Sequence, residues 1–170
     1  MLEGVNTLSR NQVTFHTTSN CSISKAGNNF VKSKIFSTNC ESSDYNNGGC
    51  GFKSNDPQSY GKGFNNGRGG VIAHIVNETG IYLWQFPRSC IPKDITAQTP
   101  NPSNWGTPVA HLPSTSCDIS SHFSGLKLVF DITFCGSWAG QAEVYGNSKC
   151  PTKTCLEIVG DPKNYIGEPS

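Results

Sequence analysis

The segment GVIAHIVNETGIYLWQF, residues 70–86, decides the fold class of this 170-residue chain. Two runs rich in β-branched and aromatic residues flank the tetrapeptide Asn77-Glu78-Thr79-Gly80. A short polar stretch that ends in glycine between two such runs is typical of a β-hairpin. The segment therefore predicts two antiparallel strands joined by a tight turn.

Strand periodicity recurs on both sides of this hairpin. In QVTFHT, residues 12–17, apolar side chains alternate with polar ones, and the polar face ends in His16. In LKLVFDITF, residues 126–134, every second residue is apolar. A period of two predicts strands with one buried face, and no segment has the pattern of a helix of ordinary length. The predicted fold class is therefore all-β, a sandwich with long loops between its strands.

The composition excludes several classes of partner. The formal net charge is +1 and charged residues make up 15% of the chain, against about 25% in an average soluble domain. The sequence thus predicts neither a nucleic-acid-binding surface nor a membrane-binding one. Its many Gly, Asn and Ser residues suit turns and surfaces that hydrogen-bond neutral hydroxyls. A neutral polymer is the more natural partner.

Eight cysteines without any C-x-x-C pair predict disulfides rather than a four-ligand zinc site. Cys150 and Cys155 are close enough in sequence to form one short loop, and the rest of the connectivity stays open. The tripeptides that begin at Asn20 and Asn77 are acceptor motifs for N-glycosylation. Both features predict an extracellular protein.

No signal peptide precedes these features, and no apolar run approaches the length of a membrane span. Either the prediction of disulfides from the cysteines is wrong, or the N-terminal part of the protein lies outside this chain. The four histidines lack the spacing of a metal site, and no acidic cluster suits calcium. We therefore expect no metal and no cofactor. Aromatic side chains beside amides suit sugar rings, but this pattern alone identifies no function.

A family resemblance adds what composition cannot supply. It is carried by LEGVNTLSRNQVTFHT (2–17), SYGKGFNNGRGGVIAHI (59–75), GIYLWQFPRSCIPKDI (80–95), SNWGTPVAHLPSTSCD (103–118), CDISSHF (117–123) and FDITFCGSWAG (130–140). Together these segments resemble the fungal-type laminarinases of glycoside hydrolase family 16, in the same order from residue 1 to about residue 160. The resemblance predicts that residues 1–170 form part of one catalytic domain.

Membership of that family implies a concanavalin-like β-jelly-roll with a glucan cleft across its concave face. It also implies a monomeric, endo-acting, retaining hydrolase of β-1,3- or β-1,3-1,4-glucans. The family continues into a further strand beyond the point where this chain stops, and it has strands before the catalytic one. We therefore expect the sheets formed by these 170 residues to be incomplete.

The resemblance also assigns catalytic positions. The family's catalytic motif is Glu-Ile-Asp-x-x-Glu-Gly, and only its end matches here, at Glu3 and Gly4. Glu3 corresponds to the general acid/base, and the nucleophile would lie before residue 1. A retaining mechanism needs both carboxyl groups about 5 to 5.5 Å apart, so the isolated chain is expected to be inactive. The alternative for Glu3 is a solvated terminal glutamate.

Two further positions carry over to substrate binding. His16 matches a histidine on the strand beside the catalytic one, with a solvated strand histidine as the alternative. Trp138 matches a tryptophan that lines the cleft, with core packing as the alternative, although Ser137 departs from the family's usual Asp. We expect Trp84 to lie in the sandwich interior, and Trp105 receives no role.

A second class of function stays open on the sequence alone. A protein that keeps the floor of the cleft without the nucleophile would be a non-catalytic, secreted glucan-binding protein. The genomic DNA upstream of the Met1 codon separates the two hypotheses, because it either continues in frame into Glu-Ile-Asp and a signal peptide or does not.

Overall fold

The computed structural model describes residues 8–24, 31–43, 46–130, 134–147 and 153–164, together with the backbone of residues 2–3. The chain divides into two compact units. The first comprises residues 1–4 and 8–126, and the second comprises residues 5–7 and 127–170. That both belong to one catalytic domain stays a prediction.

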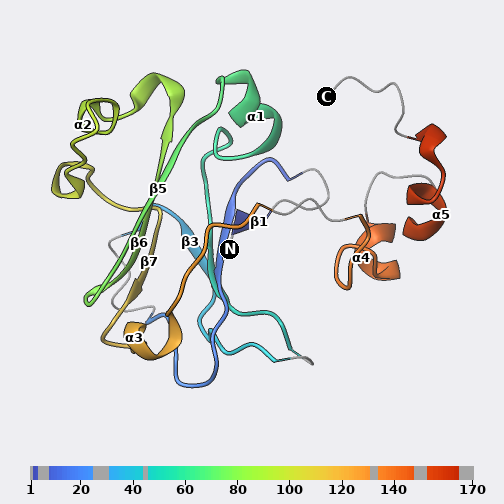
Figure 1. Ribbon diagram of the computed structural model, residues 1–170, viewed down its shortest axis with the longest axis horizontal. Coiled ribbons are helices and arrows are strands. Elements are labelled where there is room, and N and C mark those ends of the chain that lie inside the picture. The colour runs from blue at the N-terminus through green and yellow to red at the C-terminus, as the bar shows by residue number, and fades with distance from the viewer. Residues whose placement is uncertain are drawn as a thin grey trace. The chain divides into compact units, whose positions relative to one another are not determined.

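The first unit contains two antiparallel sheets (Figure 1). The four-stranded sheet has the order β1-β2-β4-β3, with β1 at Leu2–Glu3, β2 at Gln12–Phe15, β3 at Lys34–Ser37 and β4 at Cys50–Lys53. The three-stranded sheet has the order β5-β6-β7, with β5 at Gly70–Asn77, β6 at Gly80–Pro87 and β7 at Ala110–Pro113. The all-β prediction is confirmed.

The helices of the described residues are all short, as the sequence predicts. They are α1 at Gly61–Asn66, α2 at Lys93–Thr96, α3 at Ile119–His122, α4 at Ala142–Gly146 and α5 at Cys155–Val159. The described residues also form 3₁₀ turns at Arg88–Cys90, Pro102–Asn104 and Pro162–Asn164.

The predicted hairpin is present. Strands β5 and β6 pair along their whole length, and Asn77 lies opposite Gly80, so that Glu78 and Thr79 form the turn. The Asn77 side chain accepts a hydrogen bond from the Thr79 backbone N–H at 2.9 Å. Such side-chain contacts replace the backbone partner that a turn residue lacks, which explains why the chain reverses here.

The hydrophobic core lies between the two sheets. Alternate residues of each strand point into it, because successive side chains of a strand face opposite ways. The buried side chains that meet there are Val13, Phe15 and Phe52 from the first sheet and Ile81, Leu83, Ala110 and Leu112 from the second. The buried face predicted for residues 12–17 is therefore confirmed.

Trp84 is buried, but on the other face of its sheet. Its side chain is 6% exposed, and its indole N–H donates to the Gly106 carbonyl at 2.9 Å. The Trp105 ring lies edge-on against it, with the ring centroids 5.3 Å apart. The predicted burial of Trp84 is confirmed, but its ring packs on the outer face of the sheet rather than between the sheets, because Ile81 and Leu83 occupy the inward positions of β6.

Trp105 therefore has a structural role that the sequence did not reveal. Its ring also meets Phe86, with the centroids 5.8 Å apart, and its indole N–H donates to Asp94 at 2.7 Å. Hydrogen bonds from Asn101 and Trp105 hold the pKa of the Asp94 carboxyl below its usual range. The long loop after β6 is thus fixed over the outer face of the second sheet.

Within the described residues, three disulfides join Cys21 to Cys117, Cys40 to Cys50, and Cys135 to Cys155. The disulfide framework is confirmed, but the suggested pair of Cys150 and Cys155 was wrong. Residue 150 itself lies outside the described residues. Cys90 is an exposed free thiol.

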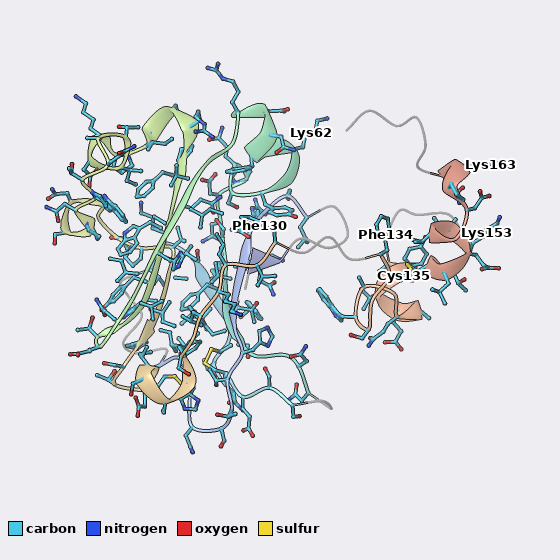
Figure 2. The ribbon with its side chains drawn as sticks, viewed as in Figure 1. Lys62, Phe130, Phe134, Cys135, Lys153 and Lys163 are labelled. Carbon is cyan, nitrogen blue, oxygen red and sulfur yellow. A yellow bond between two sulfur atoms is a disulfide. The ribbon has the colours of Figure 1, made fainter. Side chains whose placement is uncertain are left out.

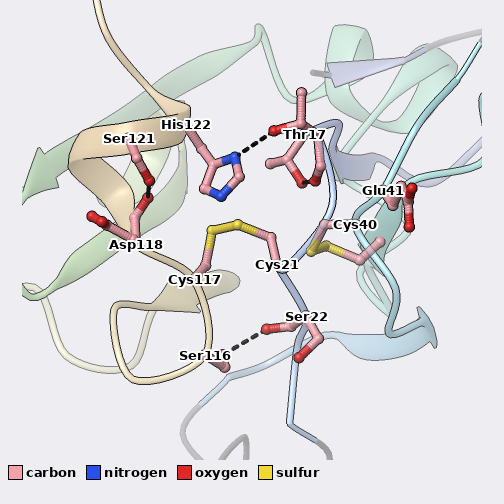
Figure 3. The surroundings of a disulfide bond; sticks show 12 residues. Thr17, Cys21, Ser22, Cys40, Glu41, Ser116, Cys117, Asp118, Ser121 and His122 are labelled. Carbon is pink, nitrogen blue, oxygen red and sulfur yellow. Dashed lines mark hydrogen bonds between the residues drawn. A yellow bond between two sulfur atoms is a disulfide. The ribbon is translucent and has the colours of Figure 1, made fainter.

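The Cys21–Cys117 disulfide closes the longest of these loops (Figure 3). Beside it, the Ser22 backbone N–H donates to the Ser116 carbonyl at 3.0 Å. The Ser116 hydroxyl donates to the Ser22 carbonyl at 2.5 Å. The disulfide therefore links two segments that are already hydrogen-bonded.

The strand predicted at 126–134 is not present where the structure describes it. Residues 126–130 form no strand, and the apolar side chains of this segment are between 58% and 89% exposed (Figure 2). Residues 131–133 lie outside the described residues. A segment with alternating apolar residues forms a strand only when a neighbouring strand pairs with its backbone N–H and C=O groups. No such partner strand is present among the described residues.

The second unit contains α4 and α5. Helix α5 begins with a capping box in which the Thr154 hydroxyl accepts from the Glu157 backbone N–H, and the Glu157 carboxylate accepts from the Thr154 backbone N–H. These contacts lower the pKa of the Glu157 carboxyl. The Cys135–Cys155 disulfide ties the start of this helix to the turn that contains Trp138.

Replacement of both Cys21 and Cys117 by Ala should lower the free energy of unfolding by about 4 kcal/mol, because the disulfide closes a long loop in the unfolded chain. The two cysteines are 96 residues apart. Urea unfolding followed by circular dichroism measures the change. Cys90→Ser is the control and should leave stability unchanged, and an equal loss in both variants would contradict the assignment.

His111 should make the fold less stable in mild acid. Its ring stacks on Tyr82, with the centroids 4.2 Å apart, and its Nε2 is buried with no hydrogen-bond partner in the described part of the chain. Burial lowers the pKa of His111 below its usual range, so the unfolded chain binds the proton more readily. The contribution of His111 to stability is complete above about pH 6.5 and is lost as the pH falls below that value.

The measurement is the melting temperature at pH 7.5 and at pH 5.0. His111→Phe keeps the stacked ring and removes the titrating group, so its decrease between the two pH values should be smaller than that of the parent chain. Equal decreases would show that His111 does not contribute to the pH dependence.

Candidate functional site

The candidate site is built on the face of the first sheet that points away from the core. Strand β1 pairs with β2 so that Glu3 lies opposite Gln12, and residues directly opposite each other in an antiparallel pair share a face. The Glu3 side chain lies outside the described residues. Its backbone lies on β1, the strand next to β2, and pairs with Gln12 of the polar face of β2.

The polar face predicted for β2 is present. The Gln12 side-chain amide donates to the Thr14 hydroxyl at 3.3 Å, which places both side chains on one side of the strand. A Cβ added to Gly49 would lie 2.9 Å from His16 Nδ1 and 3.0 Å from Thr14 Cγ2. Thr14 is buried under this neighbouring loop, while Gln12 and His16 are half-buried.

His16 is held by a residue distant in sequence. Its Nδ1 lies 2.8 Å from the Ser42 hydroxyl oxygen. This contact fixes the orientation of the imidazole ring, and with it the position of Nε2. Sequence alternation placed His16 on the polar face, but nothing in the sequence pointed to Ser42.

Trp138 belongs to the second unit, where it lies in a turn and is 48% exposed. The Gln141 backbone N–H donates to its carbonyl at 3.1 Å. The Gln141 side chain donates to the Ser137 carbonyl at 2.7 Å. The turn is thus locally ordered, and contact between Trp138 and substrate stays a prediction.

Phe36 is an aromatic side chain of this face that the sequence analysis did not single out. Its ring carbon Cε1 lies 2.5 Å from the position of a Cβ added to Gly51, and Gly51 pairs with Thr14. Phe36 therefore shares the face that carries Thr14. The only signal in the sequence was the short run KIFS at residues 34–37, which is too short to orient a strand.

Two hollows elsewhere in the first unit do not coincide with this face. One, of about 430 Å³, lies beside the β5–β6 turn and is lined by residues that include Asn77 and Asp118. The other, of about 330 Å³, lies between α1 and β5 and is lined by residues that include Asn11 and Ile72. Neither is lined by residues of the polar face.

One group of potential metal ligands consists of Cys21, Cys117 and His122, whose ligand atoms lie within 4.8 Å of one another. The two sulfurs are joined in a disulfide, so they offer no thiolate to a metal ion. The His122 Nδ1 lies 3.0 Å from the Thr18 hydroxyl oxygen. The group is a disulfide with a neighbouring imidazole.

Comparison with solved structures relates this architecture to known enzymes. A laminarinase 16A of family GH16 from Phanerochaete chrysosporium, with 2 beta-glucans in its donor and acceptor sites, aligns with a TM-score of 0.81 at 35% identity. An elongating beta-1,3-glucosyltransferase of GH family 16 aligns with a TM-score of 0.82 at 38% identity. Both alignments cover 98% of this chain and 56% of the other. They confirm the predicted jelly-roll fold.

Sequence comparison gives the same family. A probable glycosidase of Schizosaccharomyces pombe is 41% identical over 168 residues, which are 97% of this chain and 39% of the relative. The endo-1,3(4)-beta-glucanase xgeA of Emericella nidulans is 37% identical, over 99% of this chain and 26% of the relative. The chain thus spans less than half of either of these curated relatives.

The family model for the XgeA-like catalytic GH16 domain matches residues 1–167. The match extends through both compact units and includes Glu3, His16 and Trp138. This chain belongs to glycoside hydrolase family 16, among its XgeA-like catalytic domains.

Proposed function

We propose that this chain is part of the catalytic domain of a secreted, retaining endo-β-1,3(4)-glucanase. Glu3 is the general acid/base, and His16 and Trp138 contact the glucan. The observation that carries the proposal is the backbone register of β1, in which Glu3 pairs with Gln12 of the strand that carries the polar face. The family match over residues 1–167 supports it.

The chemistry follows from the retaining mechanism. Glu3 protonates the glycosidic oxygen as the bond to the anomeric carbon breaks, while a second carboxylate attacks that carbon. Glu3 then takes a proton from the water that hydrolyses the glycosyl-enzyme. The family's second carboxylate lies five positions before Glu3 and is not among residues 1–170. We therefore expect these residues alone to bind glucan without cleaving it.

His16 and Ser42 have a positioning role in this scheme. The Ser42 hydroxyl oxygen, 2.8 Å from His16 Nδ1, restricts the imidazole ring to one orientation.

An extracellular location is part of the proposal. Disulfides persist in oxidising compartments, and three are present in the described part of the chain. Asn20 and Asn77, which begin the two glycosylation motifs, are both exposed. Among the described residues, no helix has the length and apolar character that a membrane span requires.

Glucosyl transfer is a second candidate activity. One structural neighbour, at 38% identity, is an elongating beta-1,3-glucosyltransferase. Hydrolysis and transfer share the same glycosyl-enzyme and differ in whether water or a sugar hydroxyl attacks it. Products longer than the substrate, measured by chromatography, would favour transfer.

The decisive experiment joins residues 1–170 to the parts of the Emericella nidulans relative's catalytic domain that precede and follow the aligned segment. This chimera should release reducing sugar from laminarin, and Glu3→Gln should lower its kcat by about 10²- to 10⁴-fold, because Gln cannot transfer a proton. Glu143→Gln, at an exposed position of α4, is the control and should leave kcat unchanged.

The 170-residue chain should release no reducing sugar under the same conditions. Turnover by this chain alone would contradict the placement of the nucleophile outside it. An active chimera that is unaffected by Glu3→Gln would contradict the role of Glu3.

Ser42→Ala should change the state of the His16 ring in the 170-residue chain. Loss of the hydroxyl at Nδ1 should shift the ¹⁵N resonances of His16 toward those of the exposed His74, as measured by long-range ¹H–¹⁵N NMR. His122, which contacts Thr18, is the internal control and should not change. Unaltered His16 resonances would show that Ser42 does not position the ring.

A further inference from the structure

We propose that Phe36 and Gly51 form an additional glucosyl-binding subsite on the candidate face, formed by an aromatic ring that lies over a glycine. This inference rests on the proposed function, because it assumes that the face binds a β-glucan. It adds a binding position in β3 and β4, beyond the strands that carry Glu3 and His16.

The backbone of β3 directs Phe36 to this face. Ile35 lies opposite Phe52 and packs against the core, so the next residue points the other way. The register shifts between Ile35 and Ser37, which indicates a β-bulge. Bulges re-aim side chains, often beside functional sites. Phe36 is accordingly 46% exposed in an otherwise well-packed sheet.

Because Gly51 has no Cβ, the Phe36 ring can lie directly on the backbone of β4. A Cβ at this position would lie 2.5 Å from Phe36 Cε1 and 2.7 Å from Cζ. No side chain larger than hydrogen fits under the ring. The ring therefore covers the backbone of β4 instead of standing free in solvent, and its position is set before any ligand arrives. Preorganised aromatic surfaces of this kind cost little entropy on binding.

The strand order sets the distance between this ring and the catalytic strand. The sheet runs β1-β2-β4-β3, and neighbouring strands lie about 4.8 Å apart, so β4 is about 10 Å from β1. The Phe36 ring would therefore contact a sugar unit beyond the one that reacts at Glu3. Only glucans long enough to extend across the sheet would reach it.

The neighbouring side chains suit a neutral sugar. Lys53 lies between Gln12 and Lys34 in the same row across the sheet, and both lysines are exposed. An aromatic ring stacks on the C–H face of a glucosyl unit, while ammonium groups and amides donate to its hydroxyls. The combination of one apolar surface with polar donors around it fits a pyranose better than a purely apolar ligand.

The test measures binding of laminaribiose and laminaripentaose to the folded 170-residue chain by titration calorimetry. Phe36→Leu keeps the apolar volume and removes the flat ring, so it should weaken laminaripentaose binding by about five- to tenfold. It should leave laminaribiose binding unchanged if the disaccharide occupies the positions beside Glu3. Phe36→Tyr should retain the parent affinity for both.

Phe86→Leu is the matched control. Phe86 lies on the outer face of β6, against Trp105, and its replacement should not change glucan binding. Melting temperatures confirm that every variant is folded. A chain that binds laminaripentaose equally well with and without the Phe36 ring would overturn the subsite and leave the proposed function standing. A folded parent chain that binds neither sugar would overturn both.

Discussion

Burial of one face of β2 against the second sheet is the constraint on which the rest of the structure depends. Val13 and Phe15 meet Ile81 and Leu83 in the core. Because side chains alternate with a period of two, a slip of one residue would expose this whole apolar set. The core therefore fixes the register of the first sheet, and with it the residues of the opposite face. Gln12, His16 and Phe36 share that face because their neighbours are needed in the core.

The loops are held by a different set of interactions. On the outer face of the second sheet, Trp105 packs against Trp84 and Phe86 and donates to Asp94. At the other end of the first unit, the Cys21–Cys117 disulfide joins segments far apart in sequence. Both interactions lie away from the candidate face. These loop contacts therefore involve other residues than the candidate face does.

The sequence predicts those features that depend on local pattern. The hairpin at 70–86 and the polar face of residues 12–17 follow from alternation and turn composition. Trp84 shows the limit of this kind of prediction. An alternating pattern indicates that a face of the strand is buried, but it does not say which element covers that face. The pairing of Cys155 with Cys135 depends on the folded path of the chain. Phe36 was missed because a bulge, rather than a sequence repeat, directs it to the candidate face.

Binding and bond cleavage have different structural requirements in this architecture. Cleavage by a retaining mechanism needs two carboxylates within about 5 to 5.5 Å, and the proposed acid/base lies on β1. The side chains proposed to bind glucan lie on β2, β3 and β4, which contribute Val13, Phe15, Ile35 and Phe52 to the core. Among these, the Phe36 ring lies over Gly51, and Ser42 fixes His16. The proposed roles in glucan binding and in bond cleavage therefore rest on different strands of the first sheet.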